Sequence, residues 1–185
     1  MKPLSISVLI ITLIIGIGIG YALTPEYANE LAMKNSPMKE LGQADALIDQ
    51  RYYDNMIAHH LNAIDMMNQA LKSTSRQEIK DLANTIIKLD TESIAHLYQL
   101  KLTHYKDNRE ITRFSITKLG TPDENFDLRL LNALILHHDE AITSSKEMLS
   151  KTSKQDTINL ANDVIQLLTT NKQQLLQWRK AWYNI

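Results

Sequence analysis

The 185-residue chain contains 20 basic and 21 acidic residues and carries a formal net charge of −1. Because these charges are interspersed, no basic face is available for nucleic acid, and we exclude that class of partner. The absence of cysteine excludes disulfides, thiolate metal sites and thiol catalysis. Only five Gly and four Pro are present, with three of the Gly in the first 20 residues, so the composition predicts an all-α fold rather than many short strands.

The N-terminal segment, residues 1–24, is predicted to be a transmembrane anchor. Residues 4–23 contain no charged side chain and are long enough as a helix to cross a bilayer core of about 30 Å. Lys2 and the terminal amine precede this segment, so the positive-inside rule places the rest of the chain outside the cytoplasm, on the periplasmic side of a bacterial inner membrane. A cleaved signal peptide is the alternative, because Gly20-Tyr21-Ala22 weakly resembles a cleavage site.

Gly16 and Gly20 form a small-xxx-small pair that would let a second transmembrane helix approach closely. The expected partners are therefore the lipid bilayer and either an integral membrane protein complex or another copy of the chain. The alternative is that glycine is simply common in such helices. Residues 25–44 follow as a tether, which Pro25, Pro37 and Gly42 prevent from forming one long helix.

An internal duplication occupies the remainder of the chain, where a shift of 78 positions aligns two halves without a gap. The alignment pairs Asp49, Arg51, Ile57, His59, His60, Ala63 and Ile64 with Asp127, Arg129, Ile135, His137, His138, Ala141 and Ile142. It continues through Leu82-Ala83-Asn84, which meets Leu160-Ala161-Asn162. The duplication predicts two equivalent units, residues 45–106 and 124–185, joined by a linker at 107–123.

Each unit is predicted to be a helical hairpin. Apolar residues recur at spacings of three and four from Leu47 to Leu71, and again from Ile79 to Tyr105. Ser75 and Glu78 form a capping-box pattern at the start of the second helix. In the second unit, Thr121 or Asp123 is expected to cap the third helix. Two hairpins with one apolar face each predict a four-helix bundle.

The histidine pairs fall on the faces that these helices are expected to bury. At 100° per residue, His60 and His138 point inward, whereas His59 and His137 lie on the flanks. Asp90 occupies the centre of the apolar face of the second helix. A buried carboxylate is costly unless it is paired, so Asp90 is expected to contact an inward histidine or a cation.

These residues support two interpretations. Neutral imidazole is a common ligand of copper, zinc and nickel, and thioether sulfur favours Cu(I). The metal-site hypothesis therefore includes His59, His60, Met56, Met66, Asp90, His137 and His138. The alternative is a buried His-Asp-His network that only fixes the register of the helices. His96 and His104 have no repeat partner, and we interpret both as structural or incidental.

The string DNMIAHHLNAIDMM, preceded by Asp49 and Tyr52, resembles the family called domain of unknown function 305, and the resemblance covers residues 45–185. It implies a ferritin-like four-helix bundle with a duplicated His-His motif, and some members resemble periplasmic copper-binding proteins. The second copy departs from the family pattern, because Leu134 and Ser144 replace methionines. The first hairpin is therefore the expected location of a metal site.

The hypothesis for function is a membrane-anchored extracytoplasmic metal-binding protein that handles copper as Cu(I) or Cu(II). The alternative is a non-catalytic accessory or scaffold subunit of a larger membrane complex. We do not expect an enzyme, because the sequence contains no Glu-x-x-His, no His-Glu-x-x-His and no phosphate-binding glycine loop, and it predicts no cleft.

Overall fold

The computed structural model describes residues 38–112 and 116–185, all within one compact unit, Ser36–Ile185. The predicted anchor, with Gly16 and Gly20, and the tether up to residue 37 lie outside the described residues. Within the described ranges, no helix is both long and apolar enough to cross a membrane. These ranges contain helices and no strand, which confirms the all-α prediction.

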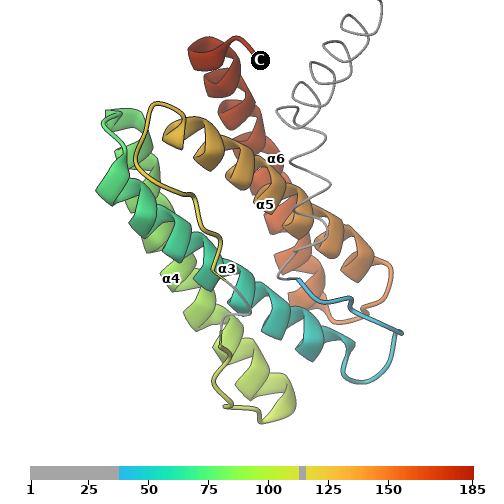
Figure 1. The fold of residues 1–185 in the computed structure, drawn as a ribbon. Coiled ribbons are helices and arrows are strands. Elements are labelled where there is room, and N and C mark those ends of the chain that lie inside the picture. The colour runs from blue at the N-terminus through green and yellow to red at the C-terminus, as the bar shows by residue number, and fades with distance from the viewer. Residues whose placement is uncertain (1–37, 113–115) are drawn as a thin grey trace, which may run out of the picture. The chain divides into compact units, whose positions relative to one another are not determined.

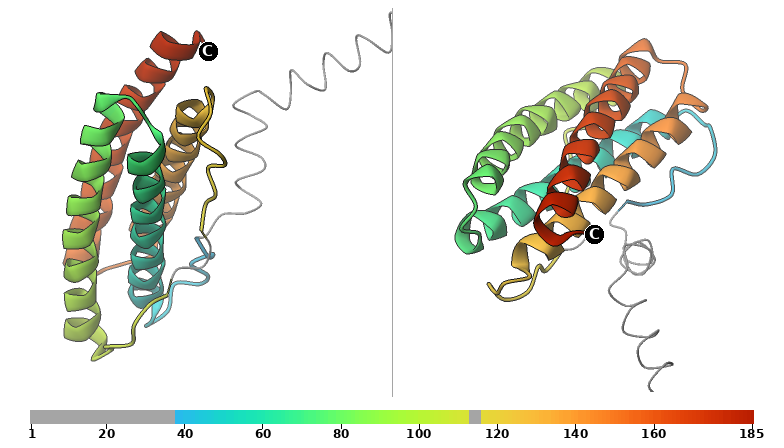
Figure 2. Two further views of the ribbon diagram at one scale, coloured as in Figure 1. Left: turned by 60° about the vertical axis from the view of Figure 1, so that its left-hand side comes forward. Right: turned by 90° about the horizontal axis from the view of Figure 1, so that it is seen from above.

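Four helices form the described unit, as Figure 1 shows: α3 (Ile48–Ser73), α4 (Gln77–Tyr105), α5 (Phe126–Leu149) and α6 (Gln155–Tyr183). Helix α4 packs along α3, α6 packs along α5, and the two hairpins meet where α3 crosses α5. In the left view of Figure 2, α3 and α5 lie on one side of the unit and α4 and α6 on the other. The backbones of α4 and α6 are not closely packed against each other.

The ends of the helices differ from the predicted capping pattern. The residue before α4 is Arg76, which makes no side-chain capping bond. Instead, the Thr74 hydroxyl accepts a hydrogen bond from the Arg76 N–H (3.1 Å), so the capping-box prediction for Ser75 and Glu78 is wrong. A threonine hydroxyl can bond a backbone group two residues further along the chain, and here Thr74 takes the role that was predicted for Ser75. Before α5, Asp123 Oδ1 accepts from the Asn125 N–H (3.0 Å).

The duplication extends into the segments that precede α3 and α5. Arg51 Nε donates to the Leu41 carbonyl and Arg129 Nε to the Leu119 carbonyl, both at 2.7 Å, and these four residues are related by the 78-residue shift. The intervening Gly42 and Gly120 have φ of 74° and 82°, a conformation that glycine adopts without steric cost. The repeat therefore begins at Leu41 and Leu119, ahead of residues 45 and 124.

Equivalent ion pairs join the two hairpins at both ends. Lys154 Nζ lies 3.3 Å from Asp49 Oδ2, and Arg76 Nε lies 3.4 Å from Asp127 Oδ2. These pairs are exchanged by the 78-residue shift, so the hairpins are related by an approximate twofold axis.

The hydrophobic core consists of two clusters, one toward each end of α3 and α5. One cluster includes Met66, Met67 and Phe126, and the other includes Tyr52 and Met56. Both histidine pairs fall between these clusters along their helices, so the polar residues occupy the middle of the bundle.

Candidate metal centre

His59 of α3 and His137 of α5 stack against each other at the contact between the hairpins. Their ring centroids are 3.5 Å apart and their planes are 5° from parallel. The side chains are only 2% and 6% exposed. Because the two residues are repeat equivalents, the stack lies at the approximate twofold axis.

This arrangement corrects the expectation that His59 and His137 lie on the flanks. Helix α3 packs against α4 and also against α5, so its buried sector is wider than the single apolar stripe used for the prediction. His59 occupies the part of that sector that faces α5.

Both ring nitrogens of His59 are buried and have no hydrogen-bond partner within the described part of the chain. Burial, reinforced by the neighbouring histidines, lowers the pKa of His59 and of His137 well below 6.5. Both imidazoles are therefore neutral at physiological pH. A neutral imidazole keeps one lone pair that can bind a metal ion.

Glu140 completes a group of three residues that could hold a metal ion. One atom each from His59, His137 and Glu140 lie within 4.8 Å of one another. Glu140 follows His137 by three positions on α5 and so projects on nearly the same side of that helix. The three residues together offer two imidazoles and one carboxylate, a set of ligands that suits a first-row transition metal.

Glu140 was not among the ligands predicted from the sequence, although the His-x-x-Glu spacing of His137 and Glu140 in the second copy was a signal for it. The repeat equivalent of Glu140 is Asn62, so the duplicated pattern does not draw attention to this position. Asn62 is buried, and its amide bonds Thr117 of the linker in both directions, at 3.2 Å each. The histidine stack therefore has a carboxylate from one hairpin only.

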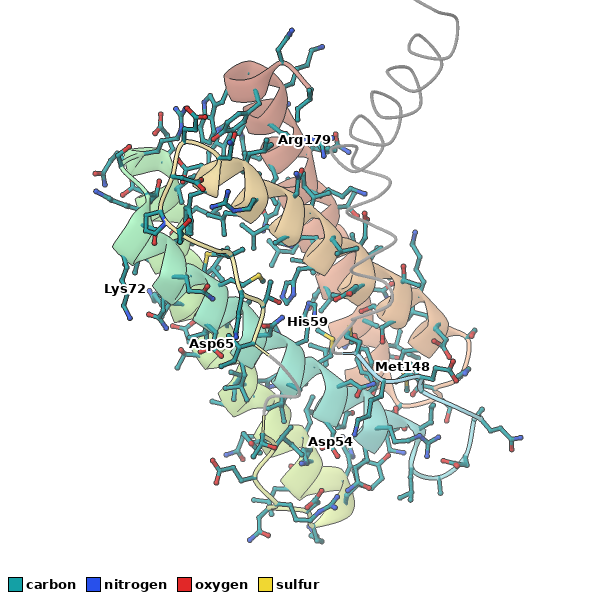
Figure 3. All side chains as sticks on the ribbon, viewed as in Figure 1. Asp54, His59, Asp65, Lys72, Met148 and Arg179 are labelled. Atoms are coloured by element: carbon teal, nitrogen blue, oxygen red, sulfur yellow. The ribbon has the colours of Figure 1, made fainter. Side chains whose placement is uncertain are left out.

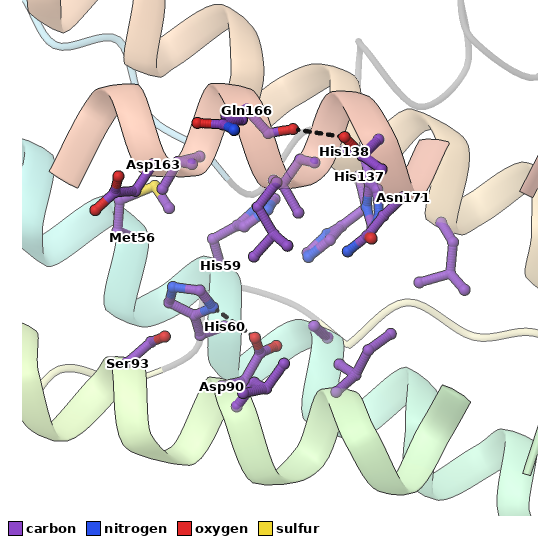
Figure 4. Close-up of a pocket in the computed structure, with 18 of the residues that line it drawn as sticks. Met56, His59, His60, Asp90, Ser93, His137, His138, Asp163, Gln166 and Asn171 are labelled. Atoms are coloured by element: carbon purple, nitrogen blue, oxygen red, sulfur yellow. Dashed lines mark hydrogen bonds and ion pairs between the residues drawn. The ribbon is translucent and has the colours of Figure 1, made fainter. Parts of the chain in front are cut away.

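His60 and Asp90 contact each other beside the stack, with 3.0 Å between Nδ1 and Oδ1 (Figure 4). This confirms the prediction that Asp90 pairs with an inward histidine. Both side chains are 16% exposed, which is less buried than expected.

His138 is more deeply buried than His60, with 5% of its surface exposed. Its Nδ1 has no hydrogen-bond partner among the described residues. Burial lowers its pKa to about 4, although the carboxylates of Asp90 and Asp139 act in the opposite direction. His138 thus adds a third neutral imidazole.

A cavity of about 570 Å³ opens between α4 and α6, and all four paired histidines line it. The labelled residues of Figure 4 show how α3, α4, α5 and α6 each contribute to its wall. The lining includes repeat-equivalent pairs: Met56 and Leu134, His59 and His137, His60 and His138, Ile86 and Val164, Leu89 and Leu167, Asp90 and Leu168, and Ser93 and Asn171. The expectation that there is no cleft is therefore wrong, because α4 and α6 do not close over the centre of the bundle.

The remaining predicted ligands are distributed unevenly. Met56 lines the cavity, whereas Met66 is buried in a hydrophobic cluster and is not part of the lining. His96 is exposed, and His104 Nε2 forms a hydrogen bond with Asp156 Oδ2 on the surface (3.1 Å). The structure thus brings together histidines from both hairpins, whereas the sequence analysis favoured the first hairpin. The labelled side chains of Figure 3 place His59 in the middle of the bundle.

A comparison with protein families bears out the resemblance for part of the chain. The family described as domain of unknown function DUF305 matches residues 24–101. This range contains His59, His60 and Asp90 but not the second histidine pair. No curated protein matches the chain significantly.

Solved structures of the protein CopM share this fold. The apo form is 28% identical in sequence, with a TM-score of 0.65, and the alignment covers 73% of this chain and 98% of that chain. The Cu(I)-bound form has 28% identity and a TM-score of 0.66, and the alignment covers 73% and 97% of the two chains. The Cu(II)-bound form has 25% identity and a TM-score of 0.63, with the same coverage.

Proposed function

We propose that this chain is a membrane-anchored, extracytoplasmic copper-binding protein whose ion is held by His59, His137 and Glu140. The observation that carries the proposal is the state of the His59 ring, which is neutral and fully buried and whose two nitrogens have no hydrogen-bond partner in the described residues. Leaving buried polar atoms unsatisfied costs about 1–3 kcal/mol per group. A bound ion would satisfy one of these atoms.

The donor set fits copper. Copper lies at the top of the affinity order of the divalent first-row metals, and imidazole is a good ligand for it. The Glu140 carboxylate suits Cu(II), and the Met56 thioether in the adjoining cavity suits Cu(I). The Cu(I)-bound and Cu(II)-bound structures of CopM support the choice of metal.

The protein would contribute neutral ligands that already lie close together. An imidazole nitrogen binds such an ion at about 2.0–2.1 Å, so two nitrogens of one site lie at most about 4 Å apart. The ligand atoms of the three residues are within 4.8 Å of one another. Because the two rings are stacked and their in-plane lone pairs run parallel, the rings must tilt out of the stack to share one ion. Because the imidazoles are already neutral, binding does not require them to lose a proton at physiological pH.

The location outside the cytoplasm rests on the uncharged segment at residues 4–23. We propose binding without catalytic turnover. The accessory-subunit hypothesis remains the alternative, and it requires a stoichiometric larger assembly after gentle detergent extraction.

A titration of the full chain in detergent micelles tests the proposal. Cu(II), and Cu(I) under anaerobic reducing conditions, are titrated in competition with chelators of known affinity. The double variant His59→Leu with His137→Leu should lose at least about a hundredfold in affinity, which corresponds to about 2.7 kcal/mol. Leucine fills the vacated volume but offers no ligand atom.

The matched control is His96→Leu with His104→Leu, which removes two histidines outside the cavity and should leave the affinity unchanged. Equal affinity in the stack variant and the control, or no copper binding by the unaltered chain, would refute the proposal.

A further inference from the structure

The two sides of the His59–His137 stack are covered differently. Asn55 and Asn62 lie four residues before and three residues after His59, on the same face of α3. They occupy the flank of that face opposite to Met56 and Ala63, and neither asparagine lines the cavity. Asn55 Nδ2 donates to the Lys39 carbonyl at 2.7 Å, and Asn62 Nδ2 donates to Thr117 Oγ1 at 3.2 Å. The segment before α3 and the linker after α4 therefore both cross this side of the helix, one on each side of His59.

A third contact holds the linker over the same side of α3. Gln69 Nε2 donates to the Thr117 carbonyl at 2.8 Å, and Gln69 Oε1 accepts from the Leu119 N–H at 3.1 Å. A metal ion approaching from this side would have to displace hydrogen-bonded backbone.

The cavity side is open by comparison. The backbones of α4 and α6 are not closely packed against each other, and the cavity between them reaches His59 and His137 directly. Two repeat-equivalent leucines of the lining, Leu89 and Leu167, are 43% and 52% exposed and so lie toward the solvent end of the cavity.

The charges of the lining favour a cation. Asp90 and Asp163 are its charged residues, and no lysine or arginine occurs among the described residues that line it. Carboxylates in a cleft with apolar walls concentrate counter-ions and accelerate their association. His138 lines the same cavity and has a buried Nδ1 without a partner among the described residues.

We infer that copper reaches the His59–His137 site through the cavity between α4 and α6, attracted by Asp90 and Asp163 and passing His60 and His138. This inference rests on the proposed function. The segment before α3 and the linker cover the side of the His59–His137 site that does not face the cavity. Copper therefore enters and leaves between α4 and α6.

Stopped-flow mixing of the full chain, in detergent micelles, with Cu(II) chloride tests the route. The double variant Leu89→Trp with Leu167→Trp narrows the opening without adding charge or changing a ligand. We expect association and dissociation to slow together by about tenfold or more, with the equilibrium affinity within about threefold of the unaltered chain. Leu102→Trp, on an exposed part of α4 outside the lining, is the matched control and should not change either rate.

A second variant isolates the charge of the cavity. Asp163→Asn should slow association severalfold at low ionic strength, and the difference should shrink as salt screens the carboxylate. Wild-type association rates in the tryptophan pair, or faster association in Asn55→Ala or Asn62→Ala, would overturn the route while leaving the site intact. Absence of copper binding by the unaltered chain would overturn the route and the proposed function together.

Discussion

His59 and His137 stack at 3.5 Å between ring centroids in the middle of the bundle, although each comes from a different copy of the repeat. Aromatic stacking contributes about 0.5–1.5 kcal/mol. The buried nitrogens of His59 oppose this stabilisation, because they have no hydrogen-bond partner among the described residues. The pair is thus poorly optimised for the stability of the metal-free bundle.

The first prediction concerns that stability. Replacing the pair with leucines, His59→Leu with His137→Leu, should raise the free energy of unfolding of the metal-free chain by about 1 kcal/mol, because it removes unsatisfied polar atoms from the core. Urea denaturation followed by circular dichroism measures the change. A loss of stability would instead support the interpretation that the histidines serve to fix helix register.

The stability of the metal-free chain should also depend on pH. The pKa values of His59, His137 and His138 lie below 6.5, that of His138 at about 4. Between these values the unfolded chain binds more protons than the folded chain, so the free energy of unfolding falls as the pH falls from about 6.5 toward 4. Each such histidine contributes up to about 1.4 kcal/mol per pH unit.

Chemical denaturation at a series of pH values measures this slope. His138→Gln should reduce it, whereas His96→Gln, at an exposed position, should not. Equal slopes in the two variants would contradict the buried, neutral state of His138.

Glu140 should discriminate between oxidation states of copper. Glu140→Gln removes a carboxylate oxygen, so the affinity for Cu(II) should fall by about tenfold or more, with a smaller loss for Cu(I), which prefers softer ligands. Competition titrations with each ion provide the comparison. Glu147→Gln, two helical turns further along α5, is the control, and an equal effect of both variants would argue against Glu140 as a ligand.

A partly buried ion pair between Lys101 and Asp54, near the start of α3, should matter for folding but not for copper. Lys101 Nζ is fully buried and lies 2.6 Å from Asp54 Oδ1 and 3.4 Å from Asp107 Oδ2. Asp54→Ala should lower the free energy of unfolding by about 3 kcal/mol, because it leaves a buried ammonium poorly compensated. A change in copper affinity of the folded variant would show that this network and the metal site are coupled, contrary to our account.

The fold was predictable because the same helix-turn-helix pattern occurs twice in the sequence, so each copy confirms where the helices of the other begin and end. Two copies of one amphipathic hairpin require a bundle, and Asp90 on an apolar face required a partner, which proved to be His60. The stack was not predictable, because the direction of His59 depends on how the hairpins pack, and helix periodicity within one hairpin carries no information about this. Glu140 was not predicted because the candidate ligands were chosen largely from residues shared by both copies. Its repeat equivalent is Asn62, which instead hydrogen-bonds Thr117 of the linker.

The cavity could not be recognised from the sequence either. Leu89 and Leu167 follow the apolar spacing of their helices and look like ordinary core residues. Their exposure results from the separation of α4 and α6, which depends on the crossing of α3 and α5. The Met66 ligand was proposed from its proximity to the histidines along the chain, but that side chain packs in a hydrophobic cluster.

X-ray absorption spectroscopy of the copper-loaded full chain shows whether one ion is bound between the two repeats. Our account predicts two imidazole nitrogens and, for Cu(II), a carboxylate oxygen in the first coordination shell. It also predicts that His59→Leu and His137→Leu, made singly, each remove one imidazole from that shell. A shell without imidazole, or one that neither substitution changes, would contradict it.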